Sequence, residues 1–172
     1  MAALLRRLCE SQNIRIACST PVEHAFPFAP TVYPSAMPHA QQFTIQTQGQ
    51  GLYEFTDKVR AIVAGTEVDT GLCTAFVRHT SASLIIQENA DPSAKRDLEA
   101  WLNRLVPERD ELYTHTSEGP DDMPAHIKAT LTATSIAIPI MSRELTLGTW
   151  QGIYLWEHRT APHTRQVVVQ VG

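Results

Sequence analysis

The two strand patterns that end the chain constrain its fold more than any other feature of the sequence. The segment TWQGIYLWEH, residues 149–158, alternates so that Ile153, Leu155 and Glu157 share one face. A second strand pattern covers residues 165–171, after a short loop. Neighbouring strands with so short a connection run antiparallel, because a parallel pair requires a crossover of a dozen or more residues. The sequence therefore favours an antiparallel sheet.

The rest of the patterned region mixes strands and helices without the regular alternation of a parallel sheet. Period-two or apolar runs predict further strands at residues 41–48, 72–77, 84–86 and 135–140. Period-3.6 runs with caps predict helices at residues 56–64, 92–106 and about 122–133. This order predicts an α+β fold, a single domain with a largely antiparallel sheet and a few helices packed on it.

The predicted helix after Asp91-Pro92 carries the clearest apolar stripe in the chain. Aspartate is a good N-cap and proline suits the first helical position. The stripe consists of Ala94, Leu98, Trp101, Leu102 and Leu105, spaced so that they share one face. Such stripes usually face the interior, so we expect these side chains in the core.

Length, charge and cysteine content exclude several classes of protein. A chain of 172 residues with 43% hydrophobic content is long enough to form one globular domain. The net charge of −4 and the absence of a Lys/Arg-rich run argue against nucleic acid binding. No apolar run approaches the roughly 18 residues of a membrane span. Cys9, Cys18 and Cys73 are too scattered for a disulfide framework or a cysteine metal site, which favours a cytoplasmic setting.

Residues 1–40 differ from the rest of the chain. They hold five of the eleven prolines and show no sustained helix or strand period, so we interpret them as a poorly ordered extension. Their first apolar run is short and interrupted by Arg6-Arg7, which is not typical of a signal peptide. Met37 directly precedes the patterned sequence, and translation from Met37 is our preferred interpretation. The folded domain is then residues 41–172.

The stretch YTHTSEGPDDMPAHIK, residues 113–128, has the composition of a site. His115 and His126 bracket the pair Asp121-Asp122, with few core-forming residues between them. Asp122 is placed to cap a short helix, whose N-terminal partial charge favours the neutral form of His126. Neutral imidazole is the metal-binding form. The alternative is that both histidines are ordinary hydrogen-bonding groups of a loop and a helix cap.

A polar segment, called the polar break below, separates the strands predicted at residues 72–77 and 84–86. His79, Thr80, Ser81 and Ser83 interrupt an otherwise apolar run, and Glu88, Asn89 and Asp91 follow shortly after it. Polar groups between core strands need partners. The break is consistent with either a functional site or a hydrogen-bonded corner.

Three blocks together resemble one known family. RHTSASLIIQENADP, YTHTSEGPDDMPAHIKA and LGTWQGIYLWEHR, in this order and spacing, are similar to the YjbQ-like family, described as secondary thiamine phosphate synthases. The resemblance runs from about Phe43 to Gly172. It implies a curved antiparallel sheet, a homotrimer, and a polar cleft where the blocks meet.

The resemblance also implies a set of site residues. It suggests metal ligation by His79, His115 and His126. It suggests catalytic roles for Asp121, Asp122, Glu157 and Arg165, and substrate binding by Ser81, Asn89 and Asp91. His158 and His163, in the loop before the last strand, are expected to be exposed.

The chemistry of these residues is compatible with a divalent metal, either zinc or magnesium/manganese. Three imidazoles leave an open coordination position for water or a substrate oxygen, as in reactive zinc sites. Asp121 and Asp122 would orient a ligand or bind a hard cation. In thiamine phosphate synthesis a thiazole phosphate displaces pyrophosphate from a pyrimidine diphosphate, and Arg165 would stabilise the departing group. The few basic residues nearby suggest that this activity is secondary to another role.

Two other functions remain open at this level. A metal-assisted hydrolase would use the same histidines, with Glu157 or Glu88 helping to activate water. A non-catalytic trimeric binding or scaffold protein would use the histidines only to satisfy one another's hydrogen bonds.

Overall fold

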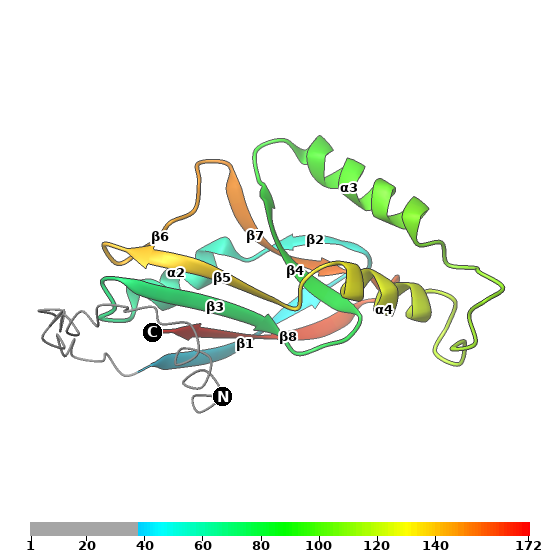
Figure 1. Cartoon of the computed structure of the whole chain (residues 1–172), viewed down its shortest axis with the longest axis horizontal. Helices are drawn as coiled ribbons and strands as arrows, with labels where there is room; N and C mark the ends of the chain where they lie inside the picture. The colour runs from blue at the N-terminus through cyan, green and yellow to red at the C-terminus, as the bar shows by residue number, and fades with distance from the viewer. Residues whose placement is uncertain (1–37) are drawn as a thin grey trace, which may run out of the picture. The chain divides into compact units, whose positions relative to one another are not determined.

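The structure, a computed structural model, describes residues 38–172, which form two antiparallel sheets and three helices (Figure 1). Nearly all of the predicted N-terminal extension, and the start site predicted at Met37, lie outside these residues. The first strand begins at His39, two residues before the expected start of the domain. None of the described helices combines the length and apolar character needed to cross a membrane.

All strand pairs in the two sheets are antiparallel, which confirms the predicted α+β class, although the last two strands lie in different sheets and do not pair with each other. The five-stranded sheet has the order β1 (His39–Thr47), β8 (His163–Val171), β3 (Gly71–Val77), β5 (Ser135–Met141) and β6 (Glu144–Leu145). The three-stranded sheet has the order β2 (Gly51–Glu54), β7 (Gln151–Glu157) and β4 (Ala82–Glu88). The helices are α2 (Thr56–Ala64), α3 (Pro92–Leu105) and α4 (Asp122–Leu131).

Three short connections carry the chain from one sheet to the other at the same end of the molecule. These crossings are the connections β1 to β2, β3 to β4 and β7 to β8. They meet because Glu157, the last residue of β7, is paired with both Gly51 and Ala82. Gly49 is required in the first crossing, since its φ is 134° and an added Cβ would lie 2.8 Å from the Thr160 carbonyl oxygen in the third. The polar break predicted after β3 is the second crossing.

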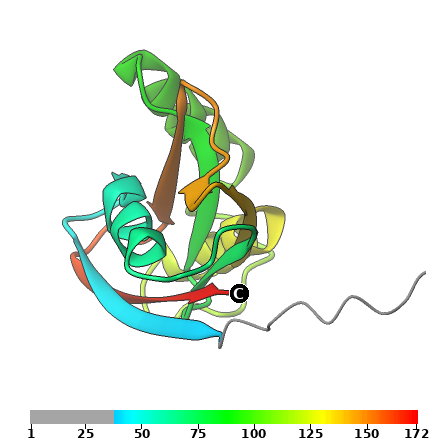
Figure 2. The same ribbon diagram turned by 90° about the vertical axis from the view of Figure 1, so that its left-hand side faces the viewer.

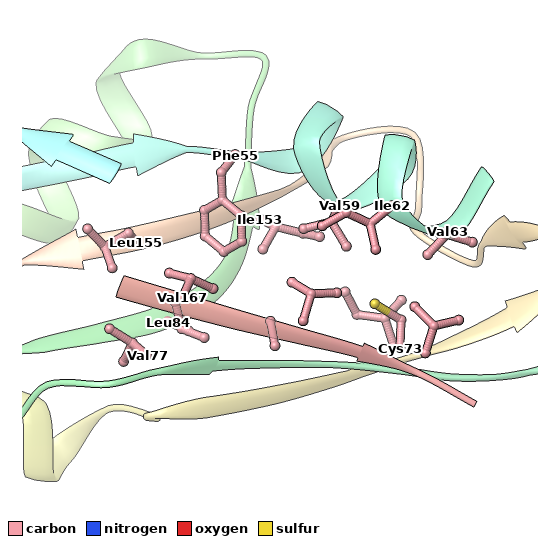
Figure 3. Close-up of a cluster of buried hydrophobic side chains, with 14 of the residues drawn as sticks. Phe55, Val59, Ile62, Val63, Cys73, Val77, Leu84, Ile153, Leu155 and Val167 are labelled. Atoms are coloured by element: carbon pink, nitrogen blue, oxygen red, sulfur yellow. The ribbon is translucent and has the colours of Figure 1, made fainter. Parts of the chain in front are cut away.

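The hydrophobic core lies between the two sheets and α2. Figure 2 shows α2 in the angle between the sheets, and Figure 3 shows its side chains pointing toward those of β3 and β8. Val59 from α2, Cys73 from β3, Leu155 from β7 and Val167 from β8 are each fully buried. The three aliphatic side chains among them each contribute about 1.5–3 kcal/mol when they leave water, so this core holds the two sheets together beneath the crossings.

Helix α3 confirms its predicted bounds but only part of its predicted burial. Asp91 caps it, since the carboxylate accepts a 2.7 Å hydrogen bond from the Ser93 amide, and Pro92 follows. Leu102 is buried, whereas Trp101 and Leu105 are each 53% exposed, so their expected place in the core is wrong. The physical reason is position: Figure 1 shows α3 set apart from the five-stranded sheet, and no described element covers this side of the helix.

Candidate functional site

His115, Asp122 and His126 form a compact cluster at the start of α4. The Nε2 atom of His115 lies 2.8 Å from Oδ2 of Asp122, and Nε2 of His126 lies 3.4 Å from the same oxygen. Asp122 and His126 come together because residues four apart share one face of a helix. The turn before α4 carries His115 back to them, with Gly119 at a φ of 108°. The structure brings both histidines of this stretch to Asp122, whereas Asp121 pairs with Arg159 instead. Asp122 is the first residue of α4 and not the N-cap that the sequence had predicted.

The donor set fits a divalent metal, and so does the spacing of His126 and Asp122, whereas His115 lies at hydrogen-bond distance from Asp122. One ligand atom from each residue lies within 4.8 Å of the others. Two ligands held at about 2.1 Å from a tetrahedral ion are about 3.4 Å apart, the separation of His126 and Asp122. The Nδ1 atom of His126 is 3.1 Å from the Thr80 carbonyl oxygen, which can only accept. That bond places the proton on Nδ1, so the Nε2 lone pair is free to face the cluster.

Arg159 stabilises the cluster through contacts with Asp121 and Asp122. Its Nη1 contacts Oδ1 of Asp122, and its Nε donates to Oδ2 of Asp121 at 3.0 Å. The first contact leaves the other oxygen of Asp122 to the histidines. Burial opposes ionisation of Asp121, but hydrogen bonds from Thr160 and Arg159 outweigh it and lower the pKa of Asp121 to about 2. The sequence reasoning assigned no role to Arg159, although its position just after a strand that ends at Glu157 was a usable signal.

Glu157 and Arg165 form a separate, fully buried ion pair. Arg165 donates to the two carboxylate oxygens of Glu157 at 2.5 and 2.6 Å, and Thr47 donates at 2.9 Å. Burial raises the cost of the Glu157 charge, but these bonds hold its pKa below the usual value. Both side chains have no exposed surface. A general base or a pyrophosphate-binding arginine must be reachable, so the structure places Glu157 and Arg165 differently from what their predicted roles require.

His79 lies near the cluster but outside it. Its Nδ1 accepts a hydrogen bond from the Ser81 amide at 3.2 Å, and the Ser81 hydroxyl is 3.1 Å from the same atom. The ring proton therefore sits on Nε2, which leaves no lone pair there for a metal. Burial, and after it the charge of Arg165, lower the pKa of His79, so the ring is neutral. Ser81 in turn accepts from Arg165 at 3.2 Å, which makes it a link between His79 and the buried ion pair.

Asn89 and Asp91 are not brought to the cluster. They follow the far end of β4, where Glu88 is paired with Gln151, whereas the near end pairs Ala82 with Glu157. At about 3.3 Å per strand residue the two ends are about 20 Å apart. Asp91 serves as the cap of α3, and the backbone N–H of Asn89 donates to the Trp150 carbonyl. Within one chain, their predicted role in binding substrate beside the histidines finds no geometric support.

Two buried polar residues behind the site were not anticipated. His158 was expected to be exposed, but only 1% of its surface is accessible, and its Nε2 lies 2.9 Å from the Ser83 hydroxyl. Burial and the nearby Lys128 charge lower its pKa to about 3. Lys128 is 2% exposed and donates to Asn103 at 2.5 Å. The loop position predicted exposure for His158, but its ring lies beside Trp156 and among residues of α3 and α4, including Leu102 and Lys128.

The cluster borders two different cavities. His115 lines a cleft of about 560 Å³, and His126, together with His79, lines a second of about 470 Å³. The two imidazole ring centres are only 5.6 Å apart. Groups bound in the two cavities would therefore approach one another at the cluster.

Comparison with known proteins places the chain in a family. Residues 41–172 match the family model described as "UPF0047 protein YjbQ-like". The UPF0047 protein sll1880 of Synechocystis is 56% identical over 77% of this chain and 90% of its own length. YjbQ of Escherichia coli O157:H7 is 37% identical over 76% of this chain and 94% of its own. These names state no reaction, ligand or metal.

Solved structures agree with this match. A YjbQ/UPF0047 family protein from Clostridium acetobutylicum superposes with a TM-score of 0.72 at 35% identity, over 77% of this chain and 99% of its own. A conserved hypothetical protein from Thermus thermophilus gives a TM-score of 0.69 at 33% identity, over 77% and 99%. The order of blocks, the antiparallel fold and these similarities lead to one conclusion: the chain belongs to the YjbQ-like, UPF0047 family.

Proposed function

We propose that this protein is a divalent-metal-dependent enzyme that joins two substrates at the cluster His115, Asp122 and His126. The observation that carries the proposal is the position of this cluster on the border of two cavities. A transferase needs two adjoining binding spaces and a shared reactive centre. The resemblance to secondary thiamine phosphate synthases names such a reaction, in which thiazole phosphate displaces pyrophosphate from a pyrimidine diphosphate.

The contacts of each residue indicate the role that it would have in this reaction. A metal bound by His115, Asp122 and His126 would supply positive charge for the oxygens of a diphosphate. Arg159 holds the Asp122 carboxylate in orientation, and the Thr80 carbonyl fixes the tautomer of His126. Arg159 is 13% exposed, so it is also the arginine of this group that solvent reaches, unlike Arg165. Arg165 acts indirectly, by holding Glu157 and Ser81.

The rival functions have weaker support. A hydrolase requires a free base beside the cluster, but the oxygens of Glu157 accept bonds from Arg165, Thr47 and the Arg159 amide, and Glu88 lies at the far end of β4. A binding protein without chemistry accounts for the buried network but not for a partly exposed His–Asp–His cluster. Both rivals remain outcomes of the tests below.

The first test is metal content. Protein purified without chelator or histidine tag, then offered zinc, manganese or magnesium, should hold close to one divalent ion per chain. Asp122→Asn should lose at least tenfold in metal affinity, since it replaces a charged ligand with an amide of the same shape. His39→Ala, an exposed histidine outside the site, is the matched control and should bind as the parent does.

His79→Ala separates two versions of the metal site. Because Nδ1 of His79 accepts from the Ser81 amide, we expect this variant to retain the metal. Loss of metal in His79→Ala would instead support the three-histidine ligand set predicted from the sequence. Failure of the folded parent to bind any of the three metals would contradict the proposal.

The second test is the reaction. The metal-loaded protein should release pyrophosphate from hydroxymethylpyrimidine diphosphate only when thiazole phosphate is present. Release without thiazole phosphate would indicate the hydrolase. No release with either combination, in protein shown to hold metal, would rule out this substrate pair.

A further inference from the structure

The cleft beside His115 has the size and position of a small-molecule site. Its volume of about 560 Å³ lies within the range of known ligand pockets, roughly 300–1,000 Å³. All of its lining residues come from residues 108–123, that is, from the connection between α3 and α4 and the first turn of α4. Two hydrogen bonds of Asp110 shape the start of this segment: its carboxylate accepts from the Leu112 amide at 2.9 Å, and its carbonyl from the Tyr113 amide at 3.1 Å.

The apolar part of the lining suits a flat ring. Tyr113, Pro120 and Met123 each contribute to the wall of the cleft. The Tyr113 side chain is partly buried and its backbone is held by Asp110, so its ring is a partly fixed surface. Aromatic rings stack on such a tyrosine, and a methionine thioether packs well against a ring edge.

The charged part of the lining favours a cation. Three carboxylates, those of Glu108, Asp110 and Glu111, and one guanidinium, that of Arg109, line the cleft. Within residues 38–172, Glu108 and Glu111 form no side-chain hydrogen bond or ion pair, so both are available to a ligand. A positive charge would also be attracted to the face of the Tyr113 ring. An anion would instead meet an excess of negative charge.

We propose that this cleft binds a planar organic cation, such as an amidine or a protonated nitrogen heterocycle, stacked on Tyr113 and paired with Glu108 or Glu111. The role of this ligand as a substrate rests on the proposed function, because His115 is both a wall of the cleft and a member of the metal cluster. The phosphate-bearing part of a substrate would then lie toward the metal, and its ring toward Tyr113. This division also removes the need for many basic residues in the site.

A matched set of three flat probes tests the charge preference. Benzamidine, benzamide and benzoate have nearly the same shape but carry positive, zero and negative charge. We expect titration calorimetry or protein NMR on the full chain to show benzamidine binding at least tenfold more tightly than benzoate, with benzamide between them. Equal affinity of benzoate and benzamidine, or no binding of any probe, would overturn the proposal.

Variants locate the binding. The double variant Glu108→Gln/Glu111→Gln should weaken benzamidine about tenfold and leave benzamide unchanged, and Tyr113→Ala should weaken both. Glu144→Gln, an exposed carboxylate on β6, is the control and should have no effect. Undiminished benzamidine binding in the double variant would show that the probe binds elsewhere and would refute the site.

One further variant separates this inference from the metal proposal. His126→Ala removes a metal ligand that does not line the cleft, so it should lose metal and still bind benzamidine. Benzamidine binding in a parent that never holds metal would uphold the cleft and refute the metal centre. Metal binding without benzamidine binding would uphold the metal centre and refute the cleft as a ligand site.

Discussion

At the scale of single residues, His158 shows how burial converts an ordinary loop histidine into a pH-sensitive part of the fold. Its pKa is lowered from 6.5 to about 3, chiefly by burial and then by the Lys128 charge. A group with a lowered pKa in the folded state stabilises the fold above its unfolded pKa, and this contribution is lost as the pH falls below 6.5. Between pH 7.5 and 5.0 we expect a loss of about 2 kcal/mol from this residue.

Urea unfolding of the parent and of His158→Gln at the two pH values measures this loss. The glutamine can keep a hydrogen bond to Ser83 but has no proton to gain, so the variant should lose about 2 kcal/mol less than the parent on acidification. His39→Gln, exposed at the start of β1, should behave as the parent. Equal losses in parent and His158→Gln would show that His158 already accepts a proton in the folded state.

The site residues predicted from the sequence form local contacts, whereas those that were missed form contacts between distant parts of the chain. His115, Asp122 and His126 lie within one turn and one helix, so local geometry brings them together. Arg159 meets Asp122 across 37 residues, and His158 meets Ser83 across 75. Such contacts depend on the register of separate strands, which a single sequence does not determine.

At the scale of elements, Lys128 on α4 is a buried charged side chain that lowers the stability of the fold. The side chain is almost fully buried, and among the described residues its only hydrogen bond is to Asn103 on α3, a neutral acceptor. Burial lowers the pKa of Lys128 more than the charges of Glu108 and Asp121 raise it, which means that the fold disfavours its charge. Replacing a poorly compensated buried ion with an apolar side chain of similar length often stabilises a protein.

We therefore expect Lys128→Met to raise the free energy of unfolding by about 1–2 kcal/mol at neutral pH, measured by urea denaturation. Lys58→Met, at an exposed position on α2, should change it by less than about 0.5 kcal/mol. A destabilised Lys128→Met would mean that the ammonium group has stronger partners than Asn103. Reduced pyrophosphate release in a stabilised variant would indicate that the chain keeps Lys128 for its function.

Element predictions succeeded where a local signal was strong. The bounds of α2 agree with the predicted 56–64, and α3 begins at the Asp91 cap and ends before Pro107. The polar break at 78–83 was recognised, but its meaning was not: it marks the passage of the chain between two sheets. Alternation shows which residues of a strand share a face, but not to which sheet the strand belongs.

At the scale of the whole molecule, the exposed side of α3 is the clearest sign of a missing partner. Its apolar stripe satisfies the pattern of a core helix, yet Trp101 and Leu105 are each 53% exposed. Amphipathic helices bury such stripes, and an uncovered one marks a contact surface. The resemblance to the family suggests a homotrimer, in which the partner would be further copies of this chain. We propose that subunits of a homotrimer cover the α3 stripe.

Light scattering after gel filtration should then give three times the 19.1 kDa mass of the chain. Trp101→Glu places a charge in the proposed contact and should shift the protein to monomers, because an unpaired charge in an apolar interface is costly. Met141→Glu is the matched control, an exposed apolar residue on β5 away from α3, and it should remain trimeric. If Met141→Glu dissociates the assembly and Trp101→Glu does not, the subunits meet through the five-stranded sheet. A monomeric parent would leave the α3 stripe to a different protein and would refute the homotrimer.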